Sequence, residues 1–224
     1  MNLKNSIVLK PWGFEYVIFS YKKIGITFLK IDPKKETSLH CHSEKKTGFV
    51  ILNGSASIQV GIYKKNTLNY KPLSRLVFRP GLFHKILNKS NKSLYLLEFE
   101  TPFKKNDLIR MADKFGRKDK DYEGNNKIQK LTKDFLLFKN PKEGKINKYK
   151  FKNIKILIKS IIKPNALRIK DSKSSTAILD GFLYDNKNRK VIGTGEIVKS
   201  QTLKILMKNY KIKKKLLIMQ LLHY

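Results

Sequence analysis

The chain has 224 residues and a formal net charge of +32, with 49 Lys and Arg against 17 Asp and Glu. Hydrophobic residues make up 41% and aromatic residues 11%, which excludes an intrinsically disordered chain, and no Gly or heptad period indicates a collagen or a coiled coil. The charge is spread evenly, and A/T-rich coding of Lys, Asn and Ile explains it as well as selection does. The surface attracts anions, and nucleic-acid binding remains one alternative function.

The first half of the chain, residues 5–102, predicts β-structure. Short runs of Val, Ile, Phe, Tyr and Leu are interrupted by Gly, Pro, Asn and Ser. The predicted strands are 16–20, 24–31, 48–52, 56–62, 75–78 and 94–100. Many short strands without a helical period favour an antiparallel barrel or sandwich.

The middle segment, residues 103–148, is rich in Lys, Asp, Asn and Gly, and it predicts loops with a short helix at 106–115. Strand-like runs then resume at 154–158, 177–179, 191–192, 203–207 and 216–222, with a hairpin turn at 185–188 and a hairpin loop at 211–215. We therefore expect a first domain over 1–120, a linker with a short helix over 121–148, and a second β-domain over 149–224.

The second half resembles the first. HKILNKSNKSLYLLEFE (84–100) aligns with LKILMKNYKIKKKLLIMQL (203–221), and VILNGSA (50–56) aligns with AILDGFL (177–183). In this alignment His84 faces Leu203. The repeat therefore predicts a second β-domain that lacks the first domain's histidines.

Three of the four histidines form a pattern. His40 and His42 lie in SLHCHSEKKTGFVILNG, and His84 lies in RPGLFHKILN. Residues i and i+2 of a strand share a face, so His40 and His42 can converge while Cys41 points away as a small core residue. Three imidazoles suit Zn, Fe, Ni or Cu, with Mn where oxygen ligands join. The alternative is two exposed edge-strand histidines and one loop histidine.

The remaining sequence signals concern location. A single cysteine excludes an intramolecular disulfide. The first residues lack the apolar stretch of a signal peptide, and no apolar run is long enough to cross a membrane. These features predict a cytoplasmic protein with no membrane contact.

The histidine segments resemble the two conserved motifs of the cupin superfamily. His40, His42 and Gly54 fit the first motif, and Gly81, His84 and Asn88 fit the second. The position of the first motif's glutamate ligand is occupied by Thr47.

A closer resemblance covers residues 9–117. The segments LKPWGFEY (9–16), LLEFE (96–100) and DLIRMADKFGR (107–117) are similar to the cupin domain of type II phosphomannose isomerases. This implies an all-β chain with a metal-dependent cupin barrel (a double-stranded β-helix or jelly roll), followed here by a degenerate cupin-like domain. It also implies sugar-phosphate binding, aldose–ketose isomerisation and, by analogy, a homodimer.

The resemblance also implies roles for individual residues. His40, His42 and His84 would bind a divalent Zn, Mn, Fe or Ni ion, although Thr47 in place of the glutamate would weaken the site, change its metal or abolish it. Arg110 would bind an anion or act in catalysis, the alternative being that it pairs with acids on the surface of a short helix.

Further candidates come from the residues themselves. Strand alternation puts Glu98 on one face with Leu96 and Glu100, so it either enters a polar interior as an acid or base or faces solvent. Lys45 either contacts a substrate phosphate or belongs to a solvated loop. Arg79 either borders the pocket or is exposed. Arg117 is a further candidate for substrate binding, with the same surface-pairing alternative as Arg110.

Three functional hypotheses follow. The first is an isomerase or related enzyme acting on a phosphorylated or nucleotide-linked sugar, with an anionic small molecule as partner and no specific nucleic acid. The second is a non-catalytic cupin that binds a sugar or regulates a partner. The third is a three-histidine iron dioxygenase, because the missing carboxylate leaves a neutral set of ligands.

Overall fold

The computed structural model describes residues 5–117, 127–167, 169 and 173–223, in which 20 strands and one α-helix occur. The predicted all-β class is confirmed. The chain divides into a first unit, Met1–Pro72 with Phe78–Leu137, and a second unit, Leu73–Val77 with Phe138–Tyr224. The first unit extends past residue 120 because β12 (Ile128–Lys130) pairs with β1 (Ser6–Lys10).

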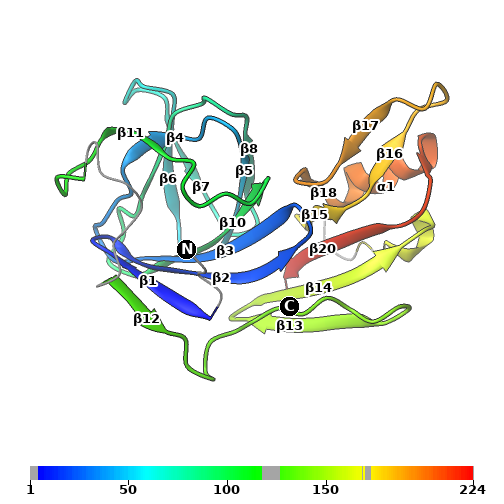
Figure 1. Cartoon of the computed structure of the whole chain (residues 1–224), viewed down its shortest axis with the longest axis horizontal. Helices are drawn as coiled ribbons and strands as arrows, with labels where there is room; N and C mark the ends of the chain where they lie inside the picture. The colour runs from blue at the N-terminus through cyan, green and yellow to red at the C-terminus, as the bar shows by residue number, and fades with distance from the viewer. Residues whose placement is uncertain (1–4, 118–126, 168, 170–172, 224) are drawn as a thin grey trace. The chain divides into compact units, whose positions relative to one another are not determined.

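The first unit consists of two antiparallel sheets (Figure 1). In spatial order the first contains β12, β1, β2 (Gly13–Tyr21), β3 (Ile24–Ile31), β10 (Leu94–Thr101), β5 (Lys46–Asn53) and β8 (Arg75–Phe78). Of β8, only Phe78 is counted in the first unit in the division given above. The second contains β11 (Ile109–Ala112), β4 (Leu39–Cys41), β9 (His84–Leu87), β6 (Ala56–Val60) and β7 (Thr67–Tyr70). From β3 to β10 the chain passes repeatedly between the sheets, which is the strand order of a jelly roll and confirms the predicted double-stranded β-helix.

The second unit repeats most of this order. Its larger sheet contains β13 (Ile146–Phe151), β14 (Ile154–Ile161), β20 (Leu216–His223), β15 (Ser175–Asp180) and β18 (Ile197–Lys199). Its smaller sheet contains β17 (Lys190–Gly193), β16 (Phe182–Tyr184) and β19 (Lys211–Ile212). The strands β14, β20, β15 and β18 take the places of β3, β10, β5 and β8, and β17, β16 and β19 take those of β7, β6 and β9. Between β14 and β15 the described residues include a 3-10 helix, η2 (Pro164–Ala166), and no counterpart of β4.

The same glycine hairpin occurs in both units and confirms the alignment of VILNGSA with AILDGFL. Gly54 and Gly181 have φ of +90° and +96°, a region that favours glycine. A Cβ on Gly54 would lie 3.3 Å from the backbone of Leu94, and one on Gly181 would lie 2.5 Å from the carbonyl oxygen of Lys215, beside Leu216. Each glycine therefore lets a hairpin pass close to the start of the long central strand of its unit, β10 or β20.

Two sequence-based predictions of local structure are wrong. The predicted strand at 203–207 lies in helix α1 (Ser200–Asn209), because Leu203 and Met207, four residues apart, pack together into the core of the second unit. The strand that matches β9 is therefore β19. The predicted helix at 106–115 contains β11 instead, which pairs with β4. The predicted turn at 185–188 is confirmed as the connection between β16 and β17.

Candidate metal and substrate site

The three histidines of the sequence pattern lie together in the first unit. His40 in β4 pairs directly with His84 at the start of β9, and His42 follows β4 by one residue. The ring centroids are 4.5 Å apart for His40 and His84, 5.1 Å for His40 and His42, and 5.4 Å for His42 and His84. One donor atom from each ring lies within 4.8 Å of the other two, so the three side chains could hold one metal ion.

The hydrogen bonds of the imidazoles orient them as ligands. In each ring Nδ1 lies beside a backbone carbonyl oxygen, which only accepts, so Nδ1 carries the proton and the lone pair is on Nε2. The accepting carbonyls belong to Ser38 for His40 (2.9 Å), Asp107 for His42 (2.5 Å) and Leu82 for His84 (3.0 Å). Nε2 of His42 and of His84 is buried and has no hydrogen-bond partner among the described residues. Carbonyl-anchored imidazoles are typical of metal ligands.

Burial keeps these rings neutral. It lowers the pKa of His42 to about 3 and that of His84 to about 4, and it holds the pKa of His40 well below its ordinary value. The neighbouring imidazoles act in the same direction on His40. A neutral imidazole has the free lone pair that a metal needs. The site therefore fits a metal that accepts nitrogen donors.

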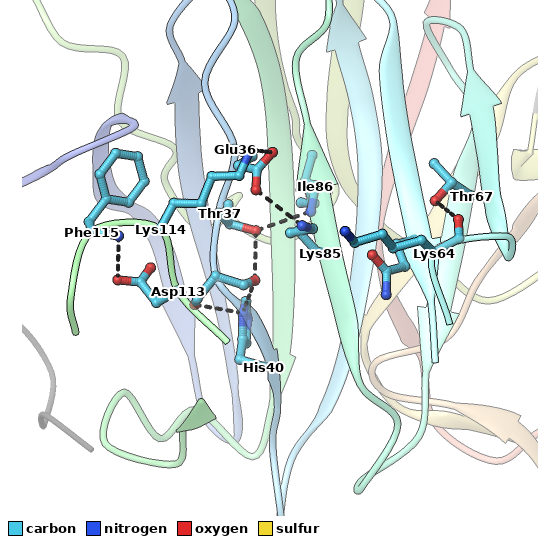
Figure 2. A network of polar contacts seen from close by, with 12 residues as sticks. Glu36, Thr37, His40, Lys64, Thr67, Lys85, Ile86, Asp113, Lys114 and Phe115 are labelled. Carbon is cyan, nitrogen blue, oxygen red and sulfur yellow. Dashed lines mark hydrogen bonds and ion pairs between the residues drawn. The ribbon is translucent and has the colours of Figure 1, made fainter. Parts of the chain in front are cut away.

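The strand segment before His40 is fixed to β9 by polar contacts (Figure 2). Thr37 Oγ1 accepts a hydrogen bond from the backbone N–H of Ile86 at 3.0 Å. The Glu36 carboxylate forms ion pairs with Lys85 and Lys114, each at 3.1 Å. These contacts hold the register in which His40 lies opposite His84.

Asp107 fixes the turn that follows His42. Its carboxylate accepts hydrogen bonds from the N–H and Oγ of Ser43, both at 2.7 Å, and from the N–H groups of Glu44 at 3.0 Å and Lys45 at 2.8 Å. Burial raises the pKa of this carboxyl, but these hydrogen bonds outweigh it and lower the pKa to about 2. One residue therefore anchors both the turn and, through its carbonyl, the ring of His42.

A buried network of charges lies beside the histidines. Glu100 Oε1 is 2.6 Å from Lys45 Nζ, and Glu100 Oε2 is 2.8 Å from Lys105 Nζ and accepts from Thr27 Oγ1 at 2.9 Å. Burial opposes ionisation of Glu100, but the two lysines outweigh it and lower its pKa. Burial and the charge of Glu100 raise the pKa of Glu98 to about 7. Glu98 is thus the acid of this group that can gain or lose a proton near neutral pH.

One pocket connects these groups and most of the predicted site residues. It encloses about 60 Å³ and is lined by residues that include His40, His42, Lys45, Glu98, Arg110 and Arg117. Five lysines and arginines line it against three glutamates, so its charge favours an anion. Arg79 is exposed and is not among the lining residues.

The contacts of the predicted cations differ from what the sequence suggested. Lys45 is buried and engaged by Glu100, and it also donates to the carbonyl of Lys104 at 2.9 Å, so it does not belong to a solvated loop. Arg117 pairs with Asp113 at 2.8 Å while lining the pocket. Arg110 lies in β11 opposite His40 and is 9% exposed.

Thr47 occupies the place where the resemblance implies a glutamate ligand. It lies in β5 opposite Glu100 and is 1% exposed. Its Oγ1 is buried without a hydrogen-bond partner among the described residues. The donor set that the structure brings together is therefore three neutral nitrogens.

Sequence reasoning assigned no role to several residues of the site. Asp107 begins the DLIRMADKFGR segment, and Glu100 shares the alternating face of Glu98, so both carried a signal in the sequence. Lys105 carried no such signal in the sequence, because a single lysine in a polar, lysine-rich segment is indistinguishable from a solvated surface lysine.

Comparisons with known proteins match less than half of the chain. No protein-family model and no curated protein matches the chain. Among solved structures, a double-stranded β-helix protein from Klebsiella pneumoniae is 17% identical, with a TM-score of 0.39, over 45% of this chain and 84% of that one. A sugar phosphate isomerase of the cupin superfamily from Silicibacter pomeroyi is 14% identical, with a TM-score of 0.37, over 40% of this chain and 59% of that one. A putative sugar phosphate isomerase from Acidithiobacillus ferrooxidans is 21% identical, with a TM-score of 0.33, over 37% and 52%.

In the described part of the chain, no helix is both long and apolar enough to span a membrane.

Proposed function

We propose that the first unit is a metal-dependent isomerase of a phosphorylated or nucleotide-linked sugar. The observation that carries this proposal is the convergence of three neutral imidazoles, fixed as Nε2 donors, two of which, His40 and His42, line a pocket that also contains an acid with a pKa near 7. The resemblance of residues 9–117 to type II phosphomannose isomerases supports mannose 6-phosphate as the first substrate to test.

In this proposal His40, His42 and His84 hold the metal. When bound, the metal acts as a Lewis acid on the carbonyl and hydroxyl oxygens of the substrate. Glu98 in its ionised form takes the proton from the carbon next to the carbonyl and returns it to the former carbonyl carbon. A pKa near 7 suits both the removal and the return of that proton.

The cations of the pocket bind the substrate's negative charge. Arg110 can hold a phosphate or an enediolate through two parallel N–H groups. The enclosed volume of about 60 Å³ accommodates the reacting carbons and their oxygens rather than a whole sugar phosphate. The phosphate then lies beyond this volume, toward Arg117.

The first test is metal content in protein purified without a histidine tag. Wild-type protein is expected to hold about one divalent ion per chain, and His42→Ala to hold almost none. The matched control is His223→Ala, which removes the exposed fourth histidine, in the second unit, and is expected to retain the metal. Equal metal content in all three proteins would overturn the proposed site.

The second test is turnover in heavy water. Mannose 6-phosphate is incubated with the metal-loaded protein, and product and carbon-bound deuterium are followed by NMR. Proton transfer by Glu98 is expected to give fructose 6-phosphate labelled with deuterium, and a chelator is expected to stop the reaction. Thermal stabilisation by the sugar without any product would instead indicate a non-catalytic binding protein.

A second candidate function is supported by Thr47. Without a carboxylate, the three histidines form a neutral ligand set, which is also compatible with an iron-dependent dioxygenase. Oxygen uptake by the Fe(II)-loaded protein, with no isomerised sugar, would favour this alternative over the isomerase.

A further inference from the structure

The second unit contains a cavity of about 530 Å³, which is within the size range of small-molecule sites. Its lining comes from β13, β14, β20 and the segment around η2. The residues that matter to the argument are Lys145, Lys148, Lys155, Lys159, Leu157 and Gln220.

The described strands of the two units differ at this place. In the first unit, the jelly roll is completed by β4, which carries His40 and leads to His42. The second unit has no counterpart of β4 among its described residues. The lining residues 155, 157 and 159 alternate along β14, and 220 and 222 alternate along β20, so one face of this strand pair borders the cavity.

Among the described residues, all charged side chains that line the cavity are positive. They are four lysines, with no aspartate or glutamate in this part of the lining. Lys159 is only 5% exposed, and its Nζ donates to the carbonyl of Ala166 at 2.7 Å. Burial of an ammonium group is costly unless a partner or a ligand offsets it. A fixed, buried cation at the cavity wall is therefore different from the solvated lysines of the rest of the surface.

The strand pairing of the two units shows that the first unit has no lysine at the position of Lys159. In the first unit Leu96 lies between Ile51 and Leu29. In the second unit Ile218 lies between Ile178 and Lys159. Lys159 thus replaces an apolar residue, Leu29, at the corresponding position of the barrel.

We propose that this cavity binds an organic phosphate of about the size of a sugar phosphate, separately from the site in the first unit. The lysines hold the phosphate, and Gln220 with Leu157 contacts the body of the ligand. The lining contains no aromatic side chain, which favours a sugar or aliphatic body over a stacked nucleobase.

The test is calorimetric titration of the full chain with fructose 6-phosphate at physiological ionic strength. The variant K155M/K159M removes two lysines from the cavity, and K213M/K214M removes two lysines from the turn before β20. Because both change the net charge equally, general attraction by the chain affects them alike. We expect K155M/K159M to weaken binding about tenfold or more and K213M/K214M to change it by less than about twofold. Equal weakening by the two variants, or no change in either, would overturn the proposal.

Two further measurements test the same proposal independently of whether K155M/K159M folds. If K155M/K159M does not fold, the same comparison is made between Lys148→Met, an exposed lining residue, and Lys214→Met. Hydrogen exchange of the His42→Ala protein should still show slower exchange in β14 and β20 when fructose 6-phosphate is added, because the site does not depend on the histidines. Loss of that protection in His42→Ala, or binding of inorganic phosphate as tightly as of the sugar phosphate, would contradict the proposed ligand and site.

Discussion

The two units have nearly the same strand order but different interiors. Both contain the glycine hairpin at Gly54 or Gly181 and a long strand, β10 or β20, at the centre of the larger sheet. The first unit has β4, three converging imidazoles and paired buried acids and lysines. The second lacks a counterpart of β4 in its described residues and has a lysine-lined cavity. The comparison teaches that hairpins and central strands maintain this fold, whereas the candidate site depends on side chains that differ between the units, those of β4 and of the central strand β10 among them.

The largest expected effect concerns Glu98 and its counterpart in the second unit, Gln220. Glu98→Gln makes the first unit resemble the second at this position. If Glu98 transfers the proton, turnover of mannose 6-phosphate is expected to fall about 10²–10⁴-fold while metal content stays unchanged. Steady-state kinetics and elemental analysis measure the two quantities.

The reciprocal change is the control for that prediction. Gln220→Glu adds a carboxylate to the lysine-lined cavity and should leave turnover unchanged while weakening the binding of fructose 6-phosphate. An unchanged turnover rate in Glu98→Gln would show that Glu98 does not transfer the proton, and it would not affect the evidence for the metal site.

The next effect concerns the buried ion pairs of Glu100 with Lys45 and Lys105. In the second unit the position that corresponds to Glu100 is occupied by Leu222. Glu100→Gln leaves the ammonium groups of Lys45 and Lys105 buried without their carboxylate. The free energy of unfolding is expected to fall by about 3–5 kcal/mol, measured in urea. Glu143→Gln, whose side chain is 92% exposed in its pair with Lys215, should change it by less than about 0.5 kcal/mol.

The same substitution has a defined pH dependence. The lysines lower the pKa of Glu100 below the 4.5 of an unpaired glutamate, so its stabilising contribution is present above about pH 4.5 and is lost as the pH falls toward 2. Glu98 has the opposite sign, because its raised pKa makes ionisation between pH 4.5 and about 7 unfavourable to the folded state. The difference in stability between wild type and Glu100→Gln should therefore shrink on acidification. A constant difference from pH 7 to pH 3 would contradict the pairing.

A smaller effect is expected at Asp107, a positioning residue with no counterpart among the contacts described in the second unit. Asp107→Asn keeps the size of the side chain but weakens the hydrogen bonds to Ser43, Glu44 and Lys45. Metal affinity is expected to fall about 10–100-fold. The control Asp134→Asn alters an exposed carboxyl. Equal metal affinity in the two variants would show that the turn after His42 is held without this carboxylate.

The smallest effect compares the two hairpins directly. Gly54→Ala and Gly181→Ala place a Cβ at positive φ, and each should destabilise the protein by about 1–2 kcal/mol. Gly181→Ala is expected to cost more because its Cβ would meet the Lys215 carbonyl oxygen at 2.5 Å, against 3.3 Å to the nearest atom at Gly54. Gly144→Ala, at φ +68° with open space around it, measures the cost of the backbone conformation alone. Thermal unfolding that ranks Gly144→Ala as the most damaging would contradict this account.

The sequence by itself determined the β class and most central strands, and it predicted that His40 and His42 can converge. These follow from local rules, because period-two alternation defines a strand and an i, i+2 pair shares a face. It also indicated the hairpin repeat, since Gly54 and Gly181 stand at the same point of two similar segments. It misjudged 203–207 because a run rich in Leu, Ile and Lys suits a strand or a helix equally, and only the packing of Leu203 and Met207 decides between them.

Only the tertiary structure decided the partners of the charged groups. Lys45 and Lys105 are two lysines among many in the sequence. Lys45 lies 55 positions from Glu100, and Lys105 lies 78 positions from Thr27, its other partner in the buried network. The same holds for the cavity of the second unit, because Lys155 and Lys159 line it together with Gln220 of β20, which the pairing of β14 with β20 brings to them. The strength of a charge pair depends on the distance between the two groups and on the exclusion of water, and the local sequence pattern determines neither.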